Sequence, residues 1–214
     1  MFKKYKSTII LTSVITLLPI IIGMILWDRL PAEIATHFGV DNQPNGYSSK
    51  TFAVFGLPLL ILGIHLLCII ATNADPKKQN ISEKAIAVVL WIIPVISLVL
   101  MSITYAYALG AKIRIGFIVI MLLGIIFIVL GNYMPKTKQN FTFGMKIPWT
   151  LNDEENWVKT HRLAGRLMVS GGAIICATAI FESPWIFFPI VVIMLAAPLA
   201  YSYKLYREKN SKDE

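Results

Sequence analysis

Charged residues are scarce in this chain. Only 15% of its 214 residues are Asp, Glu, Lys or Arg, whereas roughly 25% is usual for a soluble domain. Hydrophobic residues make up 56% of the sequence, and the mean hydropathy is +0.66. This balance excludes an ordinary soluble globular protein and indicates a membrane protein.

Residues that bind metals or carry redox chemistry are equally few. The two cysteines, Cys68 and Cys176, lie in apolar runs without metal-site or redox spacing, so we interpret them as small buried hydrophobic residues. The three histidines, His37, His65 and His161, fall in three separate segments, and no H-E-x-x-H pattern is present. We therefore expect no metal, no cofactor and no enzymatic activity.

What the chain does contain is long apolar runs. Each has about 20 residues or a few more, enough to span the ~30 Å hydrocarbon core as a helix. Because lipid cannot satisfy backbone hydrogen bonds, we expect an all-α integral membrane protein, a bundle of six transmembrane helices forming one polytopic domain over residues 1–214. The expected spans are 7–27, 51–72, 85–110, 115–134, 163–181 and 183–203.

The net charge of +8 does not indicate nucleic-acid binding, because the basic residues follow the membrane topology. Lysines and arginines gather in both terminal tails, in the link between spans two and three, and in the loop between spans four and five. By the positive-inside rule, these segments lie in the cytoplasm of a plasma-membrane protein. The first run is too long for a usual signal peptide and lacks an A-x-A site, so we expect a retained span. Anionic lipid is an expected partner, and direct nucleic-acid contact is not.

The loop at residues 28–50 would then be an extracellular module. Asn45-Gly46 is a strong turn signal and predicts a small hairpin between Phe38 and Tyr47.

Two features inside the expected spans indicate packing or function. His65 lies near the middle of the second span, where an ionisable group is either functional or a neutral imidazole bonded to a neighbouring helix. Gly116, Gly124 and Gly131 fall on one face of the fourth span, which predicts close packing against the glycine-containing fifth span.

Residues 135–162, called here the signature loop, connect spans four and five and are rich in Lys, Gly, Pro and Trp. We expect an ordered loop whose first half, to Trp149, lacks regular structure. Asn152 predicts a helix N-cap, and the helix would continue into the fifth span. Glu155, Lys159, Arg162 and Arg166 would share one face of this helix, and Trp157 and His161 another. Either face could contact a partner or anchor the helix at the membrane interface.

These residues resemble the signature of the SdpI family, the immunity-protein family of the sporulation-delay toxin system of Bacillus. The motif positions are Gly131-Asn132, Met134-Pro135-Lys136, Asn140, Gly144-Met145-Lys146-Ile147-Pro148-Trp149-Thr150-Leu151, Trp157 and Thr160-His161-Arg162. The family usually has Arg-Thr before Pro-Trp-Thr, whereas this chain has Lys146-Ile147, which removes a planar guanidinium.

The expected extracellular loop resembles the small domain of unknown function that accompanies this family. Its matching residues are Leu30-Pro31, His37-Phe38 and Pro44-Asn45-Gly46-Tyr47-Ser48-Ser49-Lys50.

The resemblance implies a membrane immunity protein that protects its cell from a secreted, membrane-active peptide toxin. It also implies an alternative or additional role as a signalling scaffold that holds an ArsR-like transcriptional repressor through the signature loop. A transporter is less favoured, since only His65 is clearly ionisable at mid-membrane depth. The candidate contact residues are Asn132, Pro135, Lys136, Asn140, Gly144, Lys146, Pro148, Trp149, Thr150, Trp157, His161, Arg162 and Arg166, with Pro31, His37, Gly46 and Tyr47 in the outer loop and His65 within the membrane.

Overall fold

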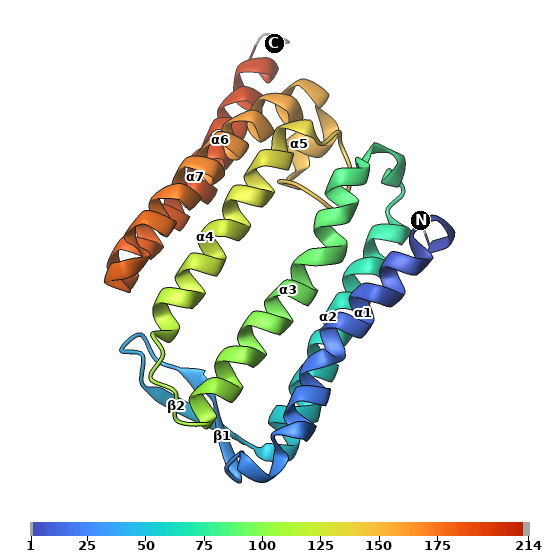
Figure 1. The fold of residues 1–214 in the computed structure, drawn as a ribbon. Helices are drawn as coiled ribbons and strands as arrows, with labels where there is room; N and C mark the ends of the chain where they lie inside the picture. Colours follow the sequence, from blue (N-terminus) through green and yellow to red (C-terminus); the bar gives the residue numbers. More distant parts are fainter. Residues whose placement is uncertain (1, 212–214) are drawn as a thin grey trace. The chain divides into compact units, whose positions relative to one another are not determined.

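The computed structural model describes residues 2–211 and consists almost entirely of helices (Figure 1). Within these residues, six helices are long and apolar enough to cross a membrane, and each overlaps one of the predicted spans. The elements are α1 (Phe2–Ile25), η1 (Trp27–Arg29), β1 (Glu33–Phe38), β2 (Pro44–Ser49), η2 (Phe52–Gly56), α2 (Leu57–Ala74), η3 (Lys78–Asn80), α3 (Glu83–Ala108), α4 (Ile115–Tyr133), η4 (Met134–Lys136), α5 (Pro148–Asn152), α6 (Glu154–Thr178), η5 (Ala179–Phe181) and α7 (Pro184–Asn210).

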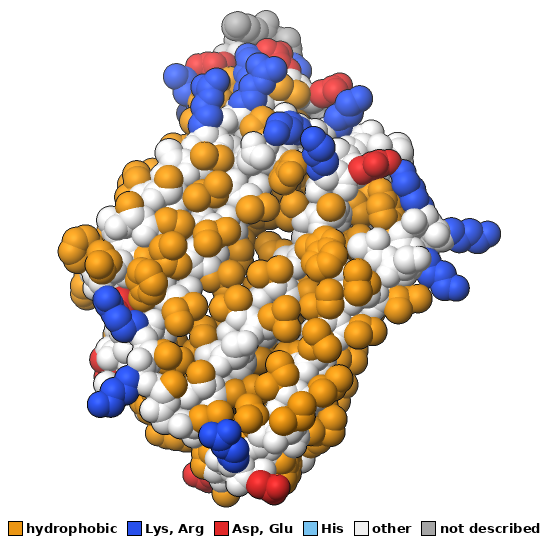
Figure 2. Space-filling view, viewed as in Figure 1, with side chains coloured by type: hydrophobic (Ala, Val, Ile, Leu, Met, Phe, Trp, Pro, Cys, Tyr) orange, Lys and Arg blue, Asp and Glu red, His pale blue; other side chains and the backbone are white. Residues whose placement is uncertain are grey.

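Large hydrophobic side chains are exposed along these helices. Figure 2 shows them on the drawn face, with Lys and Arg side chains gathered near helix ends. Ile25 is 77% exposed, Leu67 65% and Trp185 87%. Water-soluble monomers rarely expose apolar surface on this scale, whereas a lipid environment covers it without cost. The protein is therefore an all-α, multi-pass membrane protein.

The internal contacts divide the chain into two compact units. Unit 1 comprises residues 2–73 and 89–116, and unit 2 comprises residues 74–88 together with 117–211. The helices α3 and α4 continue from one unit into the other.

Unit 1 carries the predicted hairpin, formed by the antiparallel strands β1 and β2. Ile34 of β1 is 1% exposed and packs in a cluster with Val54 of η2 and with Met101 and Tyr105 of α3. The Tyr105 hydroxyl donates to the Pro19 carbonyl of α1 over 3.0 Å. The hairpin is thus fixed to the ends of three helices by a small apolar core.

The predicted position of the hairpin turn is wrong. Asn45 and Gly46 lie within β2, and the turn lies at residues 39–43, where Asn42 adopts a φ of +60°. Gly46 is instead required for close strand packing, because a Cβ there would lie 2.9 Å from the Cβ of His37. Asn42 also accepts a hydrogen bond from the Gly116 amide over 2.7 Å, which secures the turn to the start of α4.

His65 is fully buried in unit 1 and bonded to a neighbouring helix, as one of the two interpretations predicts. Its Nε2 lies 3.0 Å from the Thr12 hydroxyl of α1. The Thr16 hydroxyl donates to the Thr12 carbonyl, and the Ser97 hydroxyl of α3 donates to the Thr16 carbonyl over 3.0 Å. This polar network connects α1, α2 and α3.

In unit 2, close contact between α4 and α6 depends on glycine, as the sequence predicts. A Cβ on Gly124 would lie 3.0 Å from the Gly172 carbonyl, and one on Gly131 would lie 2.9 Å from the Gly165 carbonyl. The partners on α6 are therefore Gly165 and Gly172, whereas Gly171 packs against Met194 of α7. Helices α6 and α7 lie side by side (Figure 1).

The change Gly165→Ala is expected to destabilise unit 2 by about 1–3 kcal/mol, because overpacking forces helices apart. Its methyl group would lie 2.6 Å from Pro135 Cγ and 2.7 Å from the Gly131 carbonyl oxygen. Unfolding in detergent micelles, followed by circular dichroism, measures the effect. Gly63→Ala is the control, since nothing lies within 4 Å of its Cβ position; equal effects of the two changes would contradict the packing argument.

Candidate functional site

The signature loop folds around one tryptophan. Trp157 of α6 is 0% exposed, and its Nε1 donates to the Thr137 carbonyl over 2.6 Å. His161, one turn later and also 0% exposed, stacks on the Trp157 ring with centroids 3.9 Å apart. Its Nε2 accepts from the Met145 amide over 2.9 Å, so Nδ1 carries the proton and donates to the Trp157 carbonyl. Interfacial anchoring through Trp157 and His161 is therefore wrong, because both rings lie inside the protein.

Asn140 and Gly144 shape the loop over this pair of rings. Asn140 is fully buried; its Oδ1 accepts from the amides of Thr142 and Phe143, and its Nδ2 donates to the Phe143 carbonyl. Gly144 has a φ of +126° and lies directly against His161 Nε2, so a side chain there has neither the conformation nor the space. These two motif residues therefore form a turn that brings the Met145 amide to His161.

The expectation of an irregular first half holds for residues 137–147, but the helix α5 follows at Pro148–Asn152. Thr150 is fully buried, and its hydroxyl donates to the Met145 carbonyl over 2.7 Å. The half-buried Trp149 ring lies 5.5 Å from that of Tyr203 and 5.9 Å from that of Tyr206, both of α7. Trp149 thus attaches α5 to the end of α7.

Sequence reasoning missed Asp75, the residue that joins the loop to the α2–α3 connection. Its side chain is 4% exposed, and Oδ2 accepts from the Phe141 amide over 2.8 Å and from the Thr142 hydroxyl over 2.7 Å. Its Oδ1 accepts from the Lys77 amide. The Asp75-Pro76 pair signals a local turn, but no sequence pattern predicts a contact with residues 66 and 67 positions away.

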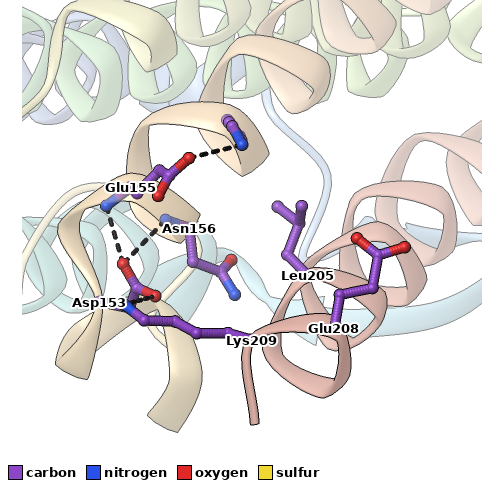
Figure 3. Close-up of a pocket in the computed structure, with 7 residues that line it drawn as sticks. Asp153, Glu155, Asn156, Leu205, Glu208 and Lys209 are labelled. Carbon is purple, nitrogen blue, oxygen red and sulfur yellow. Dashed lines mark hydrogen bonds and ion pairs between the residues drawn. The ribbon is translucent and has the colours of Figure 1, made fainter. Parts of the chain in front are cut away.

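The N-cap of α6 is Asp153, not Asn152. Its Oδ1 accepts from the amides of Glu155 and Asn156, and its Oδ2 pairs with Lys209 Nζ of α7 at 2.9 Å. Asn152 still belongs to α5, which shifts the cap by one residue. Asp153, Glu155, Asn156 and Lys209 help to line a pocket of about 280 Å³ between α6 and α7 (Figure 3). Since Glu155 also pairs with Lys159, at 2.6 Å, the pocket's charges are largely neutralised internally.

The stabilising effect of Asp153 is expected to depend on pH. Its hydrogen bond to Lys209 lowers the pKa of its carboxyl below the ordinary value of 3.8. A carboxyl with a lowered pKa stabilises the fold above its ordinary pKa and loses that effect as the pH falls through the folded-state value. Compared with Asp153→Asn, which keeps a capping oxygen, the wild type should have a free energy of unfolding about 0.5–1 kcal/mol higher at pH 7. This difference should shrink as the pH falls below the ordinary pKa of the carboxyl.

Thermal unfolding in micelles across this pH range measures the difference. Glu208→Gln serves as the control, because its pair with Lys204 is 3.7 Å long and exposed. A difference that persists unchanged at pH 2 would contradict the ionic contribution of Asp153.

A second missed group joins α6 to α7. Asn156 Nδ2 donates to the Ser202 carbonyl over 2.9 Å, and Asn156 Oδ1 accepts from the hydroxyls of Ser202 and Thr160. All three side chains are buried. The sequence signal that could have indicated this contact is the presence of a polar residue in each of two neighbouring helices, Asn156 in α6 and Ser202 in α7.

The predicted site residues separate into two groups by burial. Asn140, Thr150, Trp157 and His161 form the interior of the signature loop, with Gly144 packed against them. The exposed members are Asn132, Pro135, Lys136, Lys146, Pro148, Arg162 and Arg166. In unit 1, Pro31, His37 and Tyr47 are exposed on the hairpin, whereas His65 is buried in α2. A partner can therefore reach only the exposed members of either set.

Among residues 2–211, no group of three or more His, Cys, Asp or Glu side chains is arranged to hold a metal ion. The buried polar side chains of the signature loop bond mainly to backbone groups, an arrangement that fixes a loop conformation.

Comparisons with known proteins match the two segments that carry the sequence motifs. The model of the SdpI/YfhL protein family matches residues 136–202, from the signature loop into α7. The model of a domain of unknown function, DUF1648, matches residues 14–62, which include the hairpin. The chain is 27% identical over 208 residues to the protein named Immunity protein SdpI of Bacillus subtilis (strain 168), covering 94% of this chain and 97% of that protein. No solved structure matches the chain significantly.

The two family matches fall on the two segments that carry the sequence motifs, and the likeness to the Bacillus protein extends over nearly the whole of both chains. The resemblance that the motifs predict is therefore confirmed: residues 136–202 match the SdpI/YfhL protein family, and the likeness to Immunity protein SdpI extends over 94% of the chain.

Proposed function

We propose that this chain is a membrane immunity protein that protects its cell from a secreted peptide toxin. The observation that carries the proposal is the likeness to Immunity protein SdpI over 94% of this chain and 97% of that protein. A likeness of this extent includes both the hairpin and the signature loop, so it is not confined to a shared membrane anchor.

The orientation from the positive-inside rule places the hairpin outside the cell and the signature loop inside. A secreted peptide then meets the hairpin first. Val40 is 75% exposed and Tyr47 is 58% exposed, and side chains of this kind suit an amphipathic, membrane-active peptide. In this proposal the hairpin contacts the toxin, and the signature loop keeps α4, α6 and α7 in the protective arrangement.

Growth of a toxin-sensitive strain tests the proposal. Cells expressing the chain should grow at peptide concentrations that arrest cells with an empty vector. A double variant, Val40→Ser with Tyr47→Ser, should lose most of the protection while inserting normally. Failure of the wild type to protect at normal expression would contradict the immunity function, and full protection by the variant would contradict only the hairpin contact.

A relay function is a second candidate, favoured by two exposed cations on α6. Arg162 and Arg166 lie on the same face, and no ion pair is recorded for either within residues 2–211. Guanidinium groups bind carboxylates in a bidentate manner, so this face suits a soluble regulator such as an ArsR-like repressor. Changing both residues to Gln should abolish toxin-dependent expression from the regulator's promoter and leave protection intact. Toxin-dependent expression that persists in this variant would contradict the relay.

A further inference from the structure

Unit 2 presents a cationic and aromatic surface beside the signature loop, called here the basic patch. Its members come from two segments that are far apart in the sequence. They are Lys77, Lys136, Lys138, Phe141 and Lys146. Phe141 is 46% exposed, and it is the exposed large hydrophobic residue of the described loop between α4 and α5.

Asp75 brings these segments together. Its carboxylate accepts from the amides of Lys77 and Phe141 and from the Thr142 hydroxyl. The Lys77 ammonium lies 5.9 Å from the centre of the Phe141 ring, and the Lys146 ammonium donates to the Thr142 carbonyl over 3.4 Å. Lys77 thus lies against the Phe141 ring, and Lys146 bonds to the residue that follows Phe141.

The charge of this surface is unbalanced. The Asp75 carboxylate is 4% exposed, and both of its oxygens are used by donors inside the loop. The ammonium groups of Lys77 and Lys146 have neutral neighbours, the Gln139 amide oxygen and the Thr142 carbonyl. The patch therefore offers positive charge beside an exposed apolar ring, which suits an anionic surface with an apolar interior.

The patch also lies at the ends of membrane spans. Lys77 is three residues beyond the end of α2, and Lys136 is the last residue of the fourth candidate span. A lysine side chain is long enough to reach lipid phosphates from such positions, whereas a soluble acidic protein would have to approach the bilayer itself.

We propose that the basic patch binds anionic phospholipid headgroups, with Phe141 inserted among them, and thereby holds the signature loop against the bilayer. This binding site does not depend on the proposed immunity function. Lysines near an anionic membrane surface each contribute roughly a fivefold gain in association.

Hydrogen exchange on the full-length protein in nanodiscs tests this proposal. The measured quantity is the exchange rate of the amides at Phe141, Thr142 and Phe143. The rates should be roughly tenfold slower in phosphatidylcholine containing 30% phosphatidylglycerol than in phosphatidylcholine alone. High salt and the double variant Lys77→Gln with Lys146→Gln should each abolish the difference. Lys112→Gln, which removes a charge from the α3–α4 connection, should keep it.

Equal exchange in the two lipids would overturn the proposal. A further arm adds polyglutamate to neutral nanodiscs. No slowing there supports a lipid ligand, whereas slowing as large as that caused by phosphatidylglycerol would assign the patch to acidic proteins and also overturn the proposal.

Discussion

Trp157→Ala is expected to destabilise unit 2 by about 4 kcal/mol. Truncating a fully buried tryptophan removes its packing and leaves a cavity. The change also leaves the Thr137 carbonyl without its donor and removes the ring on which His161 stacks. Because Thr137 and His161 belong to opposite ends of the signature loop, the whole loop should unfold with the tryptophan site. Chemical unfolding in mixed micelles, followed by near-ultraviolet circular dichroism, measures this loss.

Two further variants serve as references for this measurement. Trp157→Phe keeps most of the packing and should lower the free energy of unfolding by about 1–2 kcal/mol, chiefly because the hydrogen bond is lost. Trp185→Ala removes a ring that is 87% exposed and should change stability by less than about 0.5 kcal/mol. If Trp157→Ala behaved like Trp185→Ala, the signature loop would not depend on its buried tryptophan.

Asp75→Ala is expected to release the loop from the α2–α3 connection at a cost of about 3 kcal/mol. The change leaves three donors unsatisfied, namely the amides of Lys77 and Phe141 and the Thr142 hydroxyl. Hydrogen bonds to charged groups contribute about 1.5–3 kcal/mol each, but water can reach part of this loop once it opens. Faster hydrogen exchange at Phe141 and Thr142, together with a lower unfolding midpoint, would show the release.

Asp75→Asn and Asp28→Ala are the matched comparisons. Asp75→Asn keeps one acceptor oxygen, so it should lower the stability about half as much as Asp75→Ala does. Asp28 is exposed, so Asp28→Ala should be nearly neutral. An Asp75→Ala protein with wild-type exchange at Phe141 would contradict the role of Asp75 in holding the loop.

The membrane helices could be predicted from the sequence because their signal is local. An uninterrupted apolar run such as residues 115–134 has one structural solution in lipid, and its glycines Gly124 and Gly131 could be assigned to a packing face by helical periodicity. The structure confirms that face and identifies Gly165 and Gly172 as its partners.

Local signals failed where two patterns competed. Asn45-Gly46 is a good turn former, yet Gly46 is used to pack against His37, and Asn42 supplies the positive φ of the actual turn. Asn152 and Asp153 are both good caps, and the five-residue α5 takes up Asn152, so Asp153 caps α6.

The interior of the candidate site could be predicted only in part. The motif residues Asn140, Gly144 and Trp157 are visible in the sequence, but their polarity and aromaticity indicate a contact surface as readily as a core. Trp157 bonds to the Thr137 carbonyl, and Gly144 packs against His161. No spacing rule encodes these two contacts. Sequence reasoning therefore predicted an ordered loop and could not separate its buried members from its exposed ones.

Membrane potential in toxin-treated cells tests the immunity account most directly. A toxin-sensitive strain expressing this chain, labelled with a voltage-sensitive dye, is challenged with the sporulation-delay peptide. Trp149→Ala, which removes the ring packed on Tyr203 and Tyr206, is measured beside it. If the chain is an immunity protein, wild-type cells will keep their potential at concentrations that depolarise empty-vector cells, and Trp149→Ala cells will keep less of it. Depolarisation of wild-type cells equal to that of empty-vector cells, with the protein present in the membrane, would contradict the immunity account.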